Sequence, residues 1–188
     1  MGEKDILERN LLEYRDVFAD IWNVLAFHGK QIIHPEELYL CSRTGIIPVG
    51  GSYYEIIRDV TMEWWRRNCL LAYLGVENET QKNILMAPRM HNYDGIYLWK
   101  QLLENRRKLV PVASMVLNYS NQRWDKDLST YECPRFPQGT ETLLKPCVAN
   151  QNIKVHNISF LDDETIGLFK SDFVFLQLYL HNRFTQMS

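Results

Sequence analysis

An unbroken apolar run is the feature that most restricts how this chain can fold. Residues 69–76 read CLLAYLGV, which is typical of a strand buried on both faces of a sheet. A helical pattern follows over residues 87–107, and another buried strand is predicted over 109–119, LVPVASMVLNY. Two strands joined through a helix require a crossover connection. We therefore expect an α/β fold, with a mixed sheet and helices on both of its faces.

Further elements are predicted around this unit. Residues 54–61 are rich in β-branched side chains and predict a strand that forms a hairpin with 69–76, with its turn at 64–68. Apolar residues at steps of three and four predict a helix over 5–27. The remaining expectations are a short helix at His34–Glu37, a loop or hairpin tip over 42–52 with a turn at Gly50–Gly51, irregular chain over 121–152, a strand over 153–160, and a closing helix over 171–183.

Composition and charge are those of an ordinary globular domain. The 188 residues are 46% hydrophobic and 23% charged, with a formal net charge of -2. We expect one domain over residues 1–188, which could lack a C-terminal part. The four cysteines form no CxxC pair, so we expect reduced thiols. The charged N-terminus, and the lack of a run of about 18 apolar residues, predict a cytoplasmic protein that makes no membrane contact.

Acidic residues gather at the ends of the two predicted hairpin strands. Asp59 lies in the first strand, and Glu77 and Glu79 end the second. Residues two apart on a strand point to the same face, so the two glutamates can converge with Asp59. Three carboxylates in one patch repel each other unless a cation lies between them, and Mg²⁺ and Mn²⁺ prefer oxygen ligands. The pattern therefore predicts a metal site, and a solvated loop is the alternative.

Several segments together resemble one protein family. They are Tyr54-x-x-x-Arg58-Asp59-Val60, LGVENET at 74–80, PRMHNYDG at 88–95, FADIWNVLAFHG at 18–29, VPVASMVLNY at 110–119, and the pair Trp124-Asp125. In this order they are similar to the recombination-promoting nuclease/putative transposase family. That family belongs to the PD-(D/E)XK superfamily, so the resemblance implies a restriction-endonuclease-like fold and Mg²⁺-dependent DNA cleavage.

The resemblance also implies roles for individual residues. Asp59 matches the first acid of the superfamily motif, Glu77 matches the acid that opens its second half, and Asp20 matches an acid of the first helix. Asp20 would be a peripheral metal ligand or a helix anchor. The family usually has glutamine, and the wider superfamily lysine, where this chain has Glu79. A glutamate there can only accept a proton or bind metal, which puts activity in doubt.

These residues predict a mechanism in which a metal-activated water attacks a DNA phosphodiester in line. Asp59, Glu77 and the backbone carbonyl of Asn78 would hold Mg²⁺ or Mn²⁺. Glu79 would be the general base or a further ligand.

Four arginines are the predicted DNA contacts. Arg66 and Arg67 follow two tryptophans and could grip DNA, or they could simply lie at the tip of the hairpin. Arg58 precedes the first acid. Arg89 begins the long helix and would contact phosphate or pair with Asp94.

The sequence thus predicts a DNA endonuclease linked to recombination or mobile elements, which could act as a homodimer. One alternative is an inactive relative that binds nucleic acid or a protein. Another is an interaction module that never meets DNA. Salt-dependent DNA binding would separate the last of these from the others.

Overall fold

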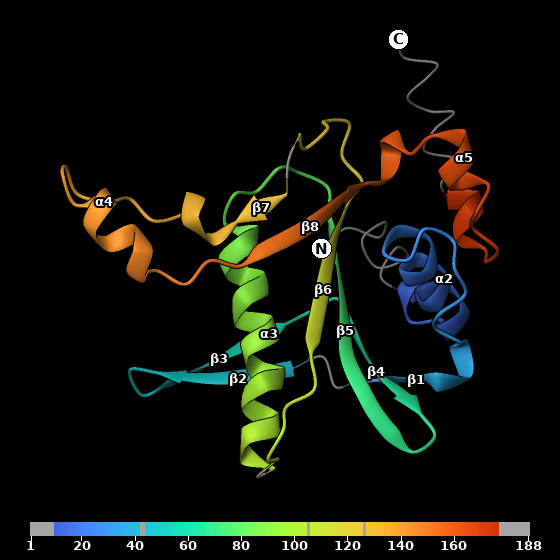
Figure 1. The fold of residues 1–188 in the computed structure, drawn as a ribbon, viewed down its shortest axis with the longest axis horizontal. Helices are drawn as coiled ribbons and strands as arrows, with labels where there is room; N and C mark the ends of the chain where they lie inside the picture. Colours follow the sequence, from blue (N-terminus) through green and yellow to red (C-terminus); the bar gives the residue numbers. More distant parts are fainter. Residues whose placement is uncertain (1–9, 42–43, 105, 126, 177–188) are drawn as a thin grey trace.

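A mixed β-sheet forms the centre of the molecule (Figure 1). The structure is a computed structural model that describes residues 10–41, 44–104, 106–125 and 127–176. Across these residues the main sheet has six strands in the order β1-β4-β5-β6-β8-β7. The β4–β5 pair is antiparallel, whereas β5–β6 and β6–β8 are parallel. The predicted mixed α/β sheet is therefore confirmed.

The predicted hairpin consists of β4 (Val60–Arg66) and β5 (Cys69–Glu79). Its turn residues Arg67 and Asn68 have φ angles of 51° and 61°. Two consecutive left-handed residues are characteristic of the tight turns that match the twist of a β-hairpin. The turn sets the register in which Val60 pairs with Val76, and it thereby places residue 59 beside residue 77.

The strand predicted over 54–61 is wrong in its extent. The chain instead forms β2 (Thr44–Val49) and β3 (Ser52–Ile57), an antiparallel pair separate from the main sheet, and then re-enters the main sheet at Val60. The predicted turn at Gly50–Gly51 is confirmed, with φ angles of 58° and 82°. Of the two alternatives for residues 42–52, a loop or a hairpin tip, the hairpin agrees with the antiparallel pairing of β2 and β3. Arg58 and Asp59 interrupt the strand because their side chains bond to groups of other elements.

The crossover helix covers one face of the sheet. It is α3 (Met86–Leu103), and it connects β5 to the parallel strand β6 (Val112–Asn118). Its buried stripe begins with Met86, Met90 and Tyr93 and packs against side chains of β6, β7 and β8. Helix and strand were both predicted, and both are confirmed.

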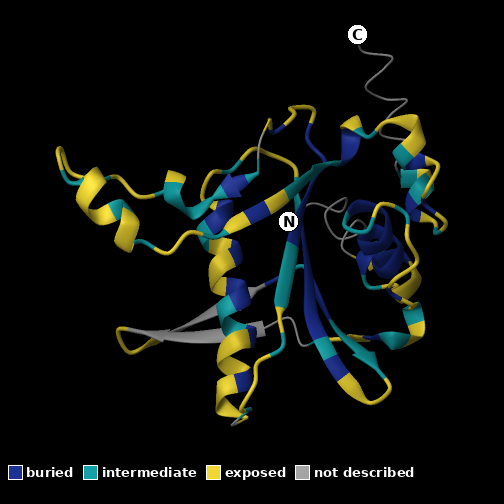
Figure 2. Cartoon of the chain, viewed as in Figure 1, coloured by how far each residue is buried: buried dark blue, intermediate teal, exposed yellow. Residues whose placement is uncertain are grey.

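Helix α2 (Arg15–Leu25) covers the opposite face, where the larger apolar core lies. The two faces alternate along each strand: Met115 and Leu117 of β6 face α2, and Val116 faces α3. The prediction of helices on both faces is therefore confirmed, and Figure 2 shows α2 coloured as buried along most of its length. The helix predicted over 5–27 is interrupted at Glu13–Tyr14, and residues 5–9 lie outside the described part.

The second half of the chain adds short elements. The predicted strand over 153–160 is β8 (Asn152–Asn157) followed by a 3-10 turn, and the predicted helix at His34–Glu37 is a 3-10 turn that leads into β1. The closing helix expected over 171–183 is described only to residue 176 and is helical from 173. The short elements are η1 (Pro35–Glu37), β1 (Leu38–Leu40), β7 (Leu128–Ser129), η2 (Thr130–Glu132), α4 (Glu141–Leu144), η3 (Lys145–Cys147), η4 (Ile158–Phe160) and α5 (Asp163–Ile166).

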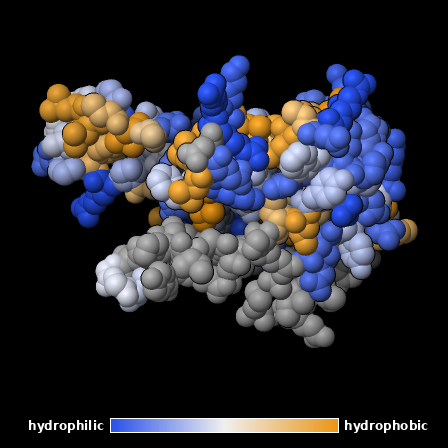
Figure 3. Space-filling view, turned by 90° about the horizontal axis from the view of Figure 1, so that it is seen from below, coloured by the Kyte–Doolittle hydropathy of each residue, from blue (hydrophilic) through white to orange (hydrophobic). Residues whose placement is uncertain are grey.

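The segment that carries α4 projects from the body (Figure 1), and Figure 3 shows apolar side chains on it at the left. Leu143 and Leu144 of this helix are exposed. Within the described ranges, no helix combines the length and the apolar character that crossing a membrane would require.

Candidate functional site: a carboxylate pair on the α3 face

Asp59 and Glu77 are held side by side by reciprocal bonds to the backbone. The Asp59 amide donates to Glu77 Oε1 at 2.9 Å, and the Asn78 amide donates to Asp59 Oδ2 at 2.9 Å. These bonds continue the β4–β5 pairing beyond Val60, where the regular ladder ends. Because Glu77 is two residues from Gly75 and four from Tyr73, it shares the α3 face with them. The structure therefore brings these two predicted site residues together.

The Asn78 carbonyl belongs to the same edge of β5. Within a strand, the N–H and C=O groups of one residue point to the same side. The Asn78 amide faces Asp59, so the carbonyl of Asn78 lies on that side as well. The neighbouring Glu79 carbonyl faces β6 instead and accepts the Tyr119 amide at 2.8 Å. The backbone position predicted as a metal ligand is thus next to the carboxylate pair.

Glu77 is buried in a place where ionisation is costly. Its residue surface is 2% exposed. Burial raises the pKa of Glu77 from 4.5 to about 8, and the negative charge of Asp59 adds to this increase. The positive charges of Arg58 and Arg89, and the Asp59 amide, act in the opposite direction. Near neutral pH, Glu77 is therefore a carboxyl group that would ionise more readily if another cation were present.

Arg89 of α3 forms a cover over the two glutamates. Its Nη1 lies 2.9 Å from Glu79 Oε1, its Nη2 lies 4.0 Å from Glu77 Oε2, and it donates to the Tyr93 hydroxyl at 3.2 Å. The Arg89 side chain is 44% exposed. Burial raises the pKa of Glu79, and Arg89 opposes that increase. Of the two roles predicted for Arg89, pairing with Asp94 is wrong, because its acidic partners are Glu79 and Glu77.

Arg58 lies between the sheet and α3. Its Nη1 donates to Asp94 Oδ1 at 3.1 Å, Nη2 donates to the Ser114 hydroxyl, and Nε lies 3.7 Å from Glu77 Oε1. Arg58 is 2% exposed. A guanidinium at this depth cannot reach the phosphates of a DNA molecule at the surface. The structure therefore does not support the prediction that Arg58 contacts DNA, and it shows Arg58 as part of an internal ion-pair network.

Asp20 lies on the other side of the sheet. It belongs to α2, and its Oδ2 accepts hydrogen bonds from the Lys170 amide, the Ser171 amide and the Ser171 hydroxyl at 2.7 to 2.8 Å. The carboxylate pair faces α3, so the sheet separates Asp20 from it. The prediction that Asp20 is a peripheral metal ligand of this site is therefore wrong. The alternative prediction, an anchor for a helix, agrees with these contacts.

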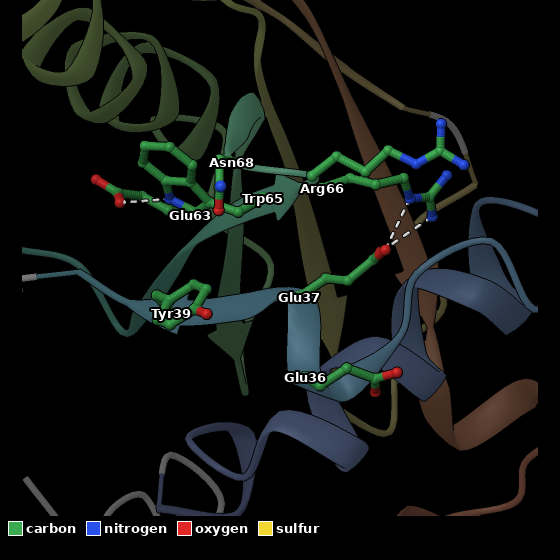
Figure 4. A pocket seen from close by; sticks show the side chains of 8 residues that line it. Glu36, Glu37, Tyr39, Glu63, Trp65, Arg66 and Asn68 are labelled. Atoms are coloured by element: carbon green, nitrogen blue, oxygen red, sulfur yellow. Dashed lines mark hydrogen bonds and ion pairs between the residues drawn. The ribbon is translucent and has the colours of Figure 1, made fainter.

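Arg66 and Arg67 lie at the opposite end of the hairpin. Arg66 lies seven positions after Asp59 along β4, which corresponds to about 23 Å. Arg66 pairs with Glu37 at 2.7 Å and stacks on Trp64, and this pairing lowers the pKa of Glu37 to about 2. Arg66 and Glu37 line a pocket of about 510 Å³ next to β1, and Figure 4 shows their ion pair. The two arginines therefore cannot form one site with Asp59 and Glu77.

The sequence reasoning missed the partners of Arg58. Asp94 receives hydrogen bonds from Arg58, from the Ser114 hydroxyl and from Gln151 Nε2, the last at 2.7 Å. One signal was available, because Asp94 falls within the apolar stripe of α3, next to Tyr93 and Tyr97. A charged residue on a buried helix face requires a buried partner.

The residues near Asp59 fit a divalent cation by their chemistry. In the described part of the chain, no group of three or more His, Cys, Asp or Glu side chains is arranged to hold a metal ion. Mg²⁺, however, is commonly held by only one or two protein carboxylates, and waters and substrate phosphates complete its shell. Asp59 and Glu77, with the Asn78 carbonyl, provide oxygen donors of this kind.

Comparisons with known proteins identify no relative. No protein-family model matches the chain, and neither a curated protein nor a solved structure is significantly similar to it. The fold is therefore described as a mixed six-stranded sheet with helices, and no fold family is assigned to it.

Proposed function

We propose that this protein is a metal-dependent nuclease that hydrolyses DNA phosphodiester bonds, within a restriction-endonuclease-like fold. The observation that carries the proposal is the carboxylate pair: Asp59 and Glu77 are fixed next to each other by two 2.9 Å bonds to backbone amides. Backbone bonds of this kind hold both side chains in place before any ligand arrives. The link to recombination or mobile elements rests only on the resemblance of short sequence segments.

The balance of charge around the pair supports a cation. Four carboxyl groups, of Asp59, Glu77, Glu79 and Asp94, share the site with the two guanidinium groups of Arg58 and Arg89. When all six groups are ionised, two negative charges remain uncompensated. A single Mg²⁺ or Mn²⁺ ion would compensate both. The high pKa of Glu77 has the same origin, since burial and the charge of Asp59 both favour its protonated form.

Asp59, Glu77 and the Asn78 carbonyl would hold the cation. A bound Mg²⁺ polarises a phosphoryl oxygen and lowers the pKa of its water. Glu79 is suited to accept a proton, because burial raises the pKa of its carboxyl group. Arg89 is the residue that can reach both the carboxylates and the solvent, so we assign it the phosphate contact. Glu77 lies beneath Arg89, and the guanidinium must move aside for a cation to enter.

Cleavage of supercoiled plasmid DNA with Mg²⁺ or Mn²⁺ tests the proposal. Glu77→Gln keeps the shape of the side chain and removes its charge, so we expect at least a 100-fold loss of cleavage, equivalent to about 3 kcal/mol. Glu63→Gln is the matched control, since Glu63 lies on β4 and pairs with Lys100 away from the site. Equal cleavage by the Glu77→Gln variant and the wild-type protein would refute the proposal.

A second candidate function is favoured by the depth of Glu77. A carboxyl that is 2% exposed and lies near two arginines can also serve as an internal structural group. The protein would then be an inactive relative that binds nucleic acid or a protein partner. Calorimetric titration with Mn²⁺ separates the two functions. An active nuclease must bind Mn²⁺, and Asp59→Ala must abolish that binding, whereas salt-dependent DNA binding without Mn²⁺ binding would identify the binding module.

A further inference from the structure

The side chain of Arg58 packs very closely against the backbone of Gly75. Its guanidinium lies directly over Gly75 of β5, where a Cβ atom would be 2.0 Å from Nη2 and 2.1 Å from Cζ. Any side chain at position 75 would therefore displace Arg58. Glycine weakens a strand interior and is retained where another group must approach the backbone closely. The glycine in LGVENET thus has a physical reason, which is the space that Arg58 occupies.

Asp94 fixes the far end of the same guanidinium. One oxygen of Asp94 accepts from Arg58 and from the Ser114 hydroxyl, and the other accepts from Gln151 Nε2 at 2.7 Å. Gln151 is in turn within 2.5 Å of His91 Nδ1, one helical turn before Asp94 in α3. Arg58 is consequently held by β6 and α3, and the segment before β8 holds Asp94.

The third edge of Arg58 faces the carboxylate pair. Its Nε lies 3.7 Å from Glu77 Oε1 and is buried, with no hydrogen-bond acceptor in the described part of the chain. A buried N–H group without an acceptor is costly. The shorter ion pair of Arg58 is therefore the one with Asp94, at 3.1 Å. The Nε atom that faces Glu77 makes no hydrogen bond among the described residues.

We propose that Arg58 is a positioning residue of the metal site: anchored by Gly75, Ser114 and Asp94, it keeps Glu77 Oε1 against the Asp59 amide and leaves Oε2 for the cation. This inference rests on the proposed function. Arg58 acts only through Glu77 and touches neither metal nor DNA. The role explains why a fully buried arginine directly precedes the first acid of the pair.

Substitution of Gly75 tests the role without altering any charged group. Gly75→Ala places a methyl group in the space of the guanidinium, and we expect the Kd for Mn²⁺, measured by calorimetry, to rise at least about tenfold. Gly95→Ala is the control, because Gly95 lies in α3 with nothing within 4 Å of its Cβ position. The control should bind Mn²⁺ within about twofold of the wild-type protein.

Asp94→Asn and Arg58→Lys keep the test informative if Gly75→Ala does not fold. Asparagine removes the charge that anchors Arg58, and lysine keeps the charge but lacks the planar fork that spans Ser114 and Asp94. For both variants we again expect a rise of at least about tenfold in the Mn²⁺ Kd. Unchanged Mn²⁺ affinity in a folded Gly75→Ala or Asp94→Asn protein would overturn the proposal.

A readout without metal separates this inference from the proposed function. The Asp59 amide donates to Glu77 Oε1, so its hydrogen exchange should accelerate when Arg58 is displaced, while the Met62 amide within β4 should not change. If the wild-type protein binds no Mn²⁺ but Asp59 exchanges faster in Asp94→Asn, then Arg58 positions Glu77 as proposed, while the metal site and the nuclease proposal fail. If Asp59 and Met62 accelerate equally, Arg58 serves only global stability and the positioning role is refuted.

Discussion

Asp20 and Glu77 are both buried carboxyl groups, one on each face of the same sheet, and their surroundings differ. One oxygen of Asp20 accepts three hydrogen bonds, two of them from backbone amides. Glu77 accepts one, from the Asp59 amide, and its two arginine neighbours remain 3.7 and 4.0 Å away. Three donors therefore stabilise Oδ2 of Asp20, while its Oδ1 is buried and has no hydrogen-bond partner among the described residues. Glu77 instead lies next to a second carboxylate, with both arginines beyond hydrogen-bond distance.

The difference distinguishes a carboxyl that holds the structure from one suited to bind a ligand. A structural carboxylate has its donors in contact, and its removal leaves those donors without a partner. A carboxyl at a binding site is destabilised in the free protein and becomes stabilised when the ligand arrives. The three predictions below test this comparison, beginning with the largest expected effect.

The pH dependence of stability should show the cost of Glu77. Its folded-state pKa, about 8, lies above the ordinary value of 4.5, so the folded protein binds the proton more tightly than the unfolded chain. The stability associated with this proton is fully present below pH 4.5 and is lost as the pH rises through 8. The expected loss is about 5 kcal/mol in the free energy of unfolding. Urea unfolding at the two pH values should show the loss in the wild-type protein and not in Glu77→Gln. An equal pH dependence in both proteins would contradict the buried-charge account.

Asp20→Ala should have the opposite profile. The substitution leaves the Lys170 and Ser171 donors without an acceptor, and we expect the free energy of unfolding to fall by about 3 kcal/mol. Mn²⁺ affinity should not change in the folded protein, because the sheet separates Asp20 from Asp59 and Glu77. Thermal unfolding and calorimetry check both parts. Weaker Mn²⁺ binding by this variant would remove the distinction between the two faces.

The arginines should give the smallest effects and also differ from each other. Arg89→Gln removes the charge that covers Glu77, and we expect DNA cleavage to fall about tenfold because a phosphate contact is lost. Arg66→Gln should leave cleavage within about twofold of wild type, since Arg66 pairs with Glu37 at the far end of the hairpin. The two variants have the same chemistry and differ only in place. Similar losses in both would show that DNA contacts extend over the whole sheet.

The sequence predicts the larger elements well because their signals are local. The apolar run at 69–76 and the periodic segment after it correctly predict β5 and α3, and their order requires the parallel crossover to β6. The interruption at Arg58–Asp59 could not be read locally. It depends on Ser114 and Asp94, which are remote in the sequence and meet Arg58 only in the folded chain.

The candidate site was predictable in part for the same reason. Strand alternation places Glu77 and Glu79 on one face, and the hairpin register adds Asp59. The spacing of residues in the sequence does not reveal that Arg89 lies on the solvent side of the carboxylates and Arg58 on the buried side. Arg89 was expected near Asp94, but Arg58 occupies that place, because the chain before β4 passes under α3.

The bonds from Asp20 to Lys170 and Ser171 join residues that are 150 and 151 positions apart. During synthesis at about 5 to 20 residues per second, helix α2 emerges from the ribosome roughly 8 to 30 seconds before these amides exist. Throughout that interval the Asp20 carboxylate must remain in water or be held by other molecules. Completion of the α2 face therefore depends on amides that are translated about 150 residues after Asp20, and a nascent chain stopped before residue 170 would leave the Asp20 carboxyl group without these donors beside the main core.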